Sequence, residues 1–216
     1  VTREKLIQVI LDAQLPDGGW NLSGENADPD MTAMAIQALA PYYKTNKTVK
    51  AAVDKALEAL SALQRTDGGF GSWGTVNSES CAQVIVALTA LGIDPTADSR
   101  FVKNGHTVLD ALAGFYVTGG GFRHTAGGER NDMATEQGYY ALAAYYRFLN
   151  GQTSLYDMSD VAIQTGGTSG GDNSGNGTNN GGTPATGDTG VLVWVIALPV
   201  TILAAAFVLK RKEREA

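Results

Sequence analysis

Apolar side chains recur at helical spacing in six separate stretches of the chain before residue 150. Positions three or four apart share one face of an α-helix, so each stretch carries an apolar stripe. The second, fourth and sixth stretches are rich in alanine and apolar on most faces, which favours an inner layer of helices. The others carry charges on one side and suit an outer layer. The pattern predicts helices over Thr2–Gln14, Met31–Tyr43, Lys47–Gln64, Glu79–Leu91, Val102–Tyr116 and Ala134–Leu149.

A short glycine-rich motif separates each outer helix from the next inner one. Gln-Leu-Pro-Asp-Gly-Gly-Trp at Gln14–Trp20 returns as Gln-Arg-Thr-Asp-Gly-Gly-Phe at Gln64–Phe70, and in degraded form at Tyr116–Phe122. The copies lie about 50 residues apart, as in structural repeats. The glycines permit the positive φ of a tight reversal. We expect the glutamines to hydrogen-bond the turn backbone. We also expect the aromatic residues Trp20, Phe70, Trp73 and Phe122 to fold back onto the helix ends.

The third copy lacks the glutamine and the aspartate, so we expect its turn to be held differently. The unit of outer helix, glycine turn, polar loop and inner helix resembles the repeat of prenyltransferases and squalene oxidases. That resemblance implies an all-α fold, in which α/α hairpins build a toroid of six units. This chain would supply about three of the six, a partial ring. Because it opens on Val1 without an initiator methionine, we expect it to be a C-terminal fragment.

Two catalytic motifs of the family that this chain resembles, one from cyclases and one from prenyltransferases, are incomplete in this sequence. The acid motif of the cyclases matches Asp28-Pro29-Asp30-Met31-Thr32-Ala33, with methionine in place of its third acid. The zinc site of the prenyltransferases is matched by Glu79-Ser80-Cys81, but its histidine position holds Ala134. We therefore assign no catalytic residue, no metal and no cofactor, and interpret Cys81 as a buried core residue. Acids, Asn, Ser and Thr at these places also suit helix N-caps.

The expected function is therefore non-catalytic ligand binding or interaction. In the family, a cavity lies at the N-termini of the inner helices. The residues expected to line it here are Asp28, Asp30, Glu79, Gln83, Glu136 and Gln137. The alternatives are a terpene cyclase or prenyltransferase-like enzyme, a cobalamin-type small-molecule binding protein, and a purely structural spacer.

Composition changes sharply after residue 150. We divide the chain into the repeats (1–150), a Gly/Ser/Asn/Thr-rich disordered linker (151–190), a transmembrane helix (191–209) and a basic cytoplasmic tail (210–216). An apolar run of 19 residues spans about 28 Å as a helix, enough for a bilayer core. The Lys/Arg cluster after it places the repeats outside the cell. A net charge of −6 argues against nucleic acid, and a single cysteine excludes a disulfide within the chain.

The linker ends in a possible anchoring signal. The residues Thr183, Pro184, Ala185, Thr186 and Gly187 resemble the LPxTG motif of Gram-positive surface proteins, with threonine in place of leucine. The order of motif, membrane span and basic tail is also that of such proteins. The resemblance implies cleavage after Thr186 by a sortase and covalent attachment to cell-wall peptidoglycan. The expected partners are therefore a sortase, peptidoglycan, the membrane and an unknown extracellular ligand.

Overall fold

In the computed structural model, residues 1–161 are described, and they contain the six predicted helices. The helices are α1 (Arg3–Asp12), α2 (Pro29–Leu39), α3 (Lys47–Leu63), α4 (Ser78–Ala90), α5 (Val108–Gly114) and α6 (Asp132–Leu149). Two 3₁₀ turns, η1 (Ala40–Tyr42) and η2 (Ser99–Phe101), follow α2 and precede the second hairpin. A compact unit runs from Val1 to Asp157, past the boundary predicted at residue 150.

The expectation of an all-α fold of α/α hairpins is wrong. In the described part of the chain, three two-stranded antiparallel sheets stand between the helices: β1 (Gly71–Ser72) with β2 (Thr75–Val76), β3 (Val102–Lys103) with β4 (His106–Thr107), and β5 (Phe122–Arg123) with β6 (Arg130–Asn131). The first and third follow the glycine turns, where the sequence predicted only polar loops. The second lies at the start of the predicted helix Val102–Tyr116, so α5 begins only at Val108.

Turn chemistry explains these hairpins. Trp73 and Gly74 have φ values of 52° and 78°, and Asn104 and Gly105 have 51° and 81°. Two successive residues at positive φ form the two-residue turn that matches the twist of an antiparallel pair, and Asn-Gly is its strongest sequence signal. Trp73 therefore sits at a hairpin tip, 79% exposed. The prediction that it folds back onto a helix end is wrong.

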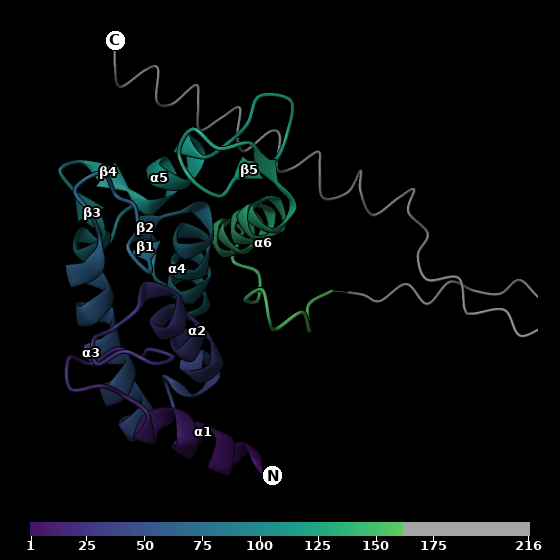
Figure 1. The fold of residues 1–216 in the computed structure, drawn as a ribbon. Helices are drawn as coiled ribbons and strands as arrows, with labels where there is room; N and C mark the ends of the chain where they lie inside the picture. Colours follow the sequence, from purple (N-terminus) through teal and green to yellow (C-terminus); the bar gives the residue numbers. More distant parts are fainter. Residues whose placement is uncertain (162–216) are drawn as a thin grey trace, which may run out of the picture. The chain divides into compact units, whose positions relative to one another are not determined.

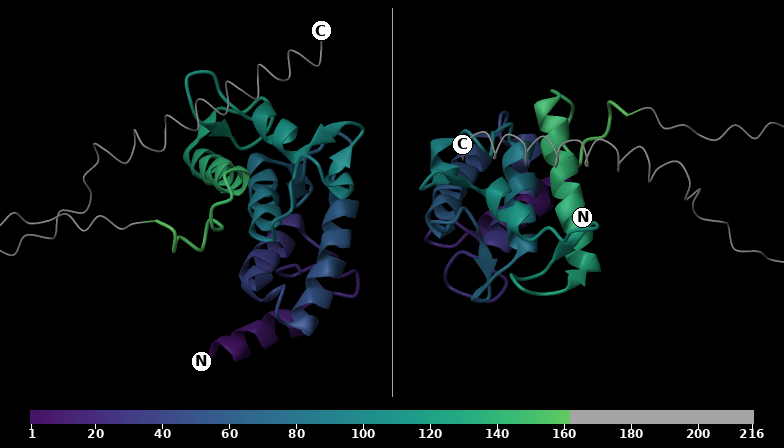
Figure 2. Two further views of the ribbon diagram at one scale, coloured as in Figure 1. Left: turned by 180° about the vertical axis from the view of Figure 1, so that it is seen from behind. Right: turned by 90° about the horizontal axis from the view of Figure 1, so that it is seen from above.

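The alanine-rich helices form the inner layer, as predicted. Helix α4 packs against both α2 and α6, while α3 packs on α2 and α5 packs on α4. Figures 1 and 2 show α3 and α6 on opposite sides of α4. The fully buried aromatic residues are Phe70, Phe101 and Phe122, which fill the space beside the glycine turns and η2.

The apolar stripe of α1 is only partly covered within the described residues, since Ile7, Ile10 and Leu11 have intermediate exposure. No side chain of this helix is buried, and Leu6 and Val9 are 55% and 65% exposed. Its best attachment is at its C-terminal end, where the Trp20 indole N–H donates to the Ile10 carbonyl at 2.6 Å. Helix α1 is therefore held to the unit mainly through the first glycine turn.

The predicted membrane span cannot be placed in this structure. No helix within residues 1–161 is long and apolar enough to cross a bilayer. The span predicted at 191–209, most of the linker and the sorting motif lie outside the described residues.

Candidate functional site

The three glycine turns share one backbone geometry. In the first, Leu15 N–H donates to the Gly19 carbonyl and Gly18 N–H donates to the Leu15 carbonyl, both at 2.9 Å. The same two bonds join Arg65, Gly68 and Gly69, and then Val117, Gly120 and Gly121, at 2.9–3.0 Å. The same turn structure therefore occurs three times. It brings the N-terminal ends of α2, α4 and α6 to one end of the inner layer.

Side chains hold the third turn differently from the first two, as predicted. The Gln14 amide donates to the Gly18 carbonyl at 2.7 Å, and the Gln64 amide to the Gly68 carbonyl at 3.0 Å. Asp17 and Asp67 accept from Gly19 N–H and Gly69 N–H in these two turns, and in the third turn the Tyr139 hydroxyl takes that place by accepting from Gly121 N–H at 3.2 Å. The glutamines also reach the next repeat, because Gln14 donates to the Ala52 carbonyl and Gln64 to the Phe101 carbonyl.

Cys81 stands where the other two inner helices have a threonine. Thr32 and Thr135 accept the backbone N–H of Trp20 and Phe122 at 2.9 and 3.0 Å. The Cys81 thiol occupies the equivalent position in α4, near the backbone of Phe70. Its side chain is fully buried, and burial raises the pKa of the thiol to about 12. Within residues 1–161, no three or more His, Cys, Asp or Glu side chains gather to hold a metal ion.

The predicted acidic residues lie at the N-termini of the inner helices, and Asp28 serves the fold. Its Oδ1 accepts from Asp30 N–H and Met31 N–H at 3.0 Å, which caps α2. Its Oδ2 accepts from the Ser72 hydroxyl of β1, so it also ties the second repeat to the first. Asp28 is only 8% exposed and has little surface left for a ligand.

Glu79 at the start of α4 pairs with a residue that sequence reasoning did not assign to the site. His124, which follows β5, places Nδ1 3.0 and 2.9 Å from the two carboxylate oxygens of Glu79. The His124 carbonyl also accepts from Ser78 N–H at 3.0 Å. The imidazole is half exposed while the Glu79 side chain is largely covered. This pair joins the second and third repeats, which only the packing could show.

Asp30, in the first turn of α2, has a raised pKa. Burial raises its pKa, assisted by the charges of Asp28 and Glu79, while the Ser80 hydroxyl and His124 oppose the shift. Ser80 lies close enough to lower this pKa, yet Asp30 Oδ1 and Ser80 Oγ form no well-aligned hydrogen bond and are both buried. Asp30 is therefore suited to carry a proton at higher pH than an exposed aspartate.

Amide side chains form a continuous chain across the inner layer. Gln37 Nε2 of α2 donates to Gln83 Oε1 of α4, and Gln83 Nε2 donates to Gln137 Oε1 of α6, each at 3.0 Å. Gln83 also donates to the Tyr140 hydroxyl, whose pKa is raised mainly by burial. We call Gln37, Gln83, Gln137 and Tyr140 the amide chain. All four side chains are partly exposed.

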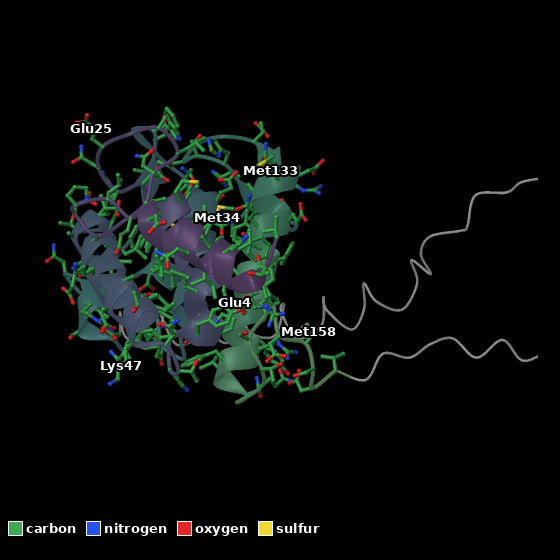
Figure 3. The ribbon with its side chains drawn as sticks, turned by 90° about the horizontal axis from the view of Figure 1, so that it is seen from below. Glu4, Glu25, Met34, Lys47, Met133 and Met158 are labelled. Carbon is green, nitrogen blue, oxygen red and sulfur yellow. The ribbon has the colours of Figure 1, made fainter. Side chains whose placement is uncertain are left out.

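Two exposed methionines stand on the same helices as the amide chain. Met34 and Met133 are 50% and 63% exposed, and Figure 3 labels both at the surface, on α2 and in the first turn of α6. Helical spacing places Met34 one turn before Gln37 and Met133 one turn before Gln137. Of the amide chain, sequence reasoning named Gln83 and Gln137 and missed Gln37 and Tyr140. Glu136, the remaining candidate, is exposed beside Tyr140 and raises its pKa slightly.

No protein-family model matches this chain, and no curated protein shows significant similarity to it. The function is therefore inferred from the chain's own residues.

A groove lies at the opposite ends of the inner helices from the predicted cavity. Its volume is about 490 Å³, within the range of small-molecule sites. Its lining includes Tyr43 and Lys44 after α2, Leu91 after α4, Phe148 near the end of α6, and parts of the segment 151–157. Gln37 belongs to both the groove and the amide chain. None of the six predicted cavity residues lines this groove.

Proposed function

We propose that this chain is a cell-surface protein whose residues 1–157 form a non-catalytic ligand-binding module, similar in its repeats to prenyltransferases and squalene oxidases. The observation that carries the proposal is the amide chain. Three helices from three repeats each contribute one glutamine to it. The backbones of these helices are bonded internally, so the glutamine side chains are not needed to satisfy them.

An amide has two donors and two acceptor sites, more than the amide chain uses. A ligand lying along the inner layer would therefore meet hydrogen-bonding groups already fixed in position. Such fixed groups reduce the ordering cost of binding. The exposed thioethers of Met34 and Met133 add adaptable apolar contacts beside them.

The surroundings of Asp28, Asp30 and Cys81 favour a binding function over a catalytic one. Asp28 is used as a helix cap, and Cys81 is a fully buried core residue. Met31 stands where the cyclase pattern has its third acid. Burial raises the pKa of Asp30, but its Oδ1 is enclosed beside Ser80 rather than open to a substrate.

A thermal-shift screen of the full chain tests ligand binding. The probes are a defined library of vitamins including cobalamin, amino acids and nucleosides. At about 100 times its Kd, a bound compound should raise Tm by about 5–10 °C. Gln83→Ala should abolish that rise, because it breaks the amide chain at its centre. The matched control is Gln8→Ala, an exposed glutamine on α1, which should respond like the wild type. A library without a hit, or a hit that Gln83→Ala leaves intact, contradicts the proposal.

Surface display is proposed from the sequence alone. It is supported by the motif from Thr183 to Gly187, the apolar run at 191–209 and the basic residues after it. Thr186→Ala should move the protein from the wall-bound to the detergent-soluble fraction of its Gram-positive host, because the scissile residue is changed. Fractionation followed by immunoblotting measures this shift. A wild type that detergent already extracts completely rules out covalent anchoring.

A further inference from the structure

The groove at the C-terminal ends of the inner helices has a wall that is fixed in place. We call residues 150–157 the strap. Arg147, near the end of α6, is only 8% exposed, and it donates from Nε to the Thr153 carbonyl at 2.8 Å and from a terminal nitrogen to the Thr153 hydroxyl at 2.9 Å. Gln152 N–H donates to the Arg147 carbonyl at 3.0 Å. The buried guanidinium therefore sets the position of the strap, and the strap supplies Tyr156 to the groove.

Three aromatic residues belong to the lining of this groove: Tyr43, Phe148 and Tyr156. Tyr156 of the strap is 68% exposed, although it lies against the unit closely enough to raise the pKa of Tyr140. The Tyr43 hydroxyl donates to Asp54 at 2.7 Å, which fixes that ring. Phe148 stacks on Tyr145 with ring centroids 6.3 Å apart. Tyr156 is thus the most open of the three aromatic side chains in the lining, and the other two are held by neighbouring residues.

The groove also offers polar groups that the fold leaves unused. Among residues 1–161, the side chains of Lys44, Gln152, Ser154 and Tyr156 make no hydrogen bond. The amide nitrogen of Gln37 is used by Gln83, which leaves its amide oxygen as an acceptor. Donors and acceptors therefore stand beside aromatic surface along one groove.

The few charged side chains in the groove lining limit which chemical classes of ligand the groove can bind. The lining holds one cation, Lys44, and one carboxylate, Asp157. A phosphate or sulfate ligand is normally held by several Arg or Lys donors, which this lining lacks. A purely apolar ligand would leave the unused polar groups of the groove desolvated without partners. A sugar ring has a C–H face that packs on an aromatic ring and a rim of hydroxyls that bond to amides and hydroxyls.

From this combination we infer that the groove binds a short neutral oligosaccharide, with one sugar ring packed on Tyr156 and its hydroxyls bonded to Gln37, Gln152 and Ser154. This inference rests on the proposed binding function and adds to it a second binding position, the groove beside Tyr156, with its ligand class. The site is separate from the N-terminal ends of the inner helices and reaches the amide chain only through Gln37.

Calorimetric titration of the full chain with chitotetraose, cellotetraose and maltotetraose tests the inference. At least one of them should bind with saturation. Tyr156→Ala should weaken binding at least about tenfold, as hot-spot aromatic residues do. Tyr156→Phe, which keeps the ring and loses the hydroxyl, should weaken it by less than about threefold. Trp73→Ala, which removes an even more exposed aromatic side chain on the β1–β2 hairpin outside the groove lining, should bind like the wild type.

The inference is overturned if none of the three oligosaccharides binds, or if Tyr156→Ala binds as well as the wild type. It is also overturned if choline or inorganic phosphate binds in their place with the same dependence on Tyr156. Failure here differs from failure of the proposed function. Suppose that a library compound binds and that its binding depends on Gln83 but not on Tyr156. That result would support the proposed ligand-binding function and contradict the inference that the groove binds an oligosaccharide.

Discussion

Gly68→Ala is expected to destabilise the protein by about 2–5 kcal/mol, the largest effect of a single methyl group that we predict. Gly68 lies in the second glycine turn with φ of +81°, and a Cβ there would come within 2.3 Å of the Thr107 carbonyl oxygen. The left-handed conformation costs an alanine about 1–2 kcal/mol. The clash is with backbone, which cannot rotate away, so overpacking adds about 1–3 kcal/mol. Urea unfolding monitored by circular dichroism measures the loss.

Gly74→Ala is the matched control. Gly74 has nearly the same φ, +78°, but a Cβ there meets nothing within 4 Å. It should therefore show only the conformational cost of about 1–2 kcal/mol. If both variants lose the same stability, the close approach of the β3–β4 hairpin to the second turn is not what makes glycine necessary at position 68.

Gln64→Ala is expected to cost about 2–4 kcal/mol. The Gln64 amide is 7% exposed and donates to two carbonyls, those of Gly68 and Phe101, each at 3.0 Å. Removing it leaves both acceptors without this donor in a place that water reaches poorly. An unsatisfied buried polar group costs about 1–3 kcal/mol. The same denaturation experiment measures this effect, with the m-value checked for a change in the unfolded state.

Gln14→Ala is the matched variant that tests whether burial controls the cost of losing this glutamine. Gln14 has the same bond pattern, to the Gly18 and Ala52 carbonyls at 2.7 and 2.8 Å, but it is only partly buried. Water can replace its amide, so the expected loss is about 1 kcal/mol. A larger loss at Gln14 than at Gln64 would show that burial does not control the strength of this link.

These two positions show how the repeats are joined. Each glutamine bonds its own turn and the backbone of the next repeat, to Ala52 in α3 or to Phe101 in η2. The His124–Glu79 pair and the Ser72–Asp28 bond add side-chain links between neighbouring repeats. Units that cannot bury their apolar faces alone are stabilised mainly at such interfaces. The repeats therefore support one another through polar contacts as well as through the helix packing.

Local rules account for the parts of the molecule that could be predicted. The 3.6-residue period located six helices, and the glycine turns with Gln14 and Gln64 marked where the outer helices end. The sequence signals for the strand pairs β1–β2 and β5–β6 were weak. Asn104-Gly105 is a strong signal for the β3–β4 hairpin, but the helical pattern of apolar residues over Val102–Tyr116 obscured it. There the backbone preference of two residues at positive φ outweighs helical periodicity over the few residues around it.

The candidate site was less predictable, because it depends on contacts between distant residues. Helix starts can be read locally from their polar and acidic residues, so Asp28, Asp30 and Glu79 could be placed at the N-terminal ends of α2 and α4, while their predicted role in a ligand cavity stays a prediction. Sequence spacing could not show that Gln37 meets Gln83 from another repeat, or that His124 pairs with Glu79. Nor could it show that Arg147 folds the strap back beside the ends of α2 and α4, because a buried guanidinium is positioned by packing.

The sequence by itself determined the helices, the repeated turn and the residues that cap the inner layer, because each depends on neighbours along the chain. The tertiary structure decided which polar side chains remain available for a ligand. Asp28 and Cys81 are used by the fold, while the amide chain and the groove beside Tyr156 keep unused hydrogen-bonding groups. Whether a polar side chain already has hydrogen-bond partners in the fold depends on the residues that pack against it. Those neighbours are fixed only when the repeats pack together.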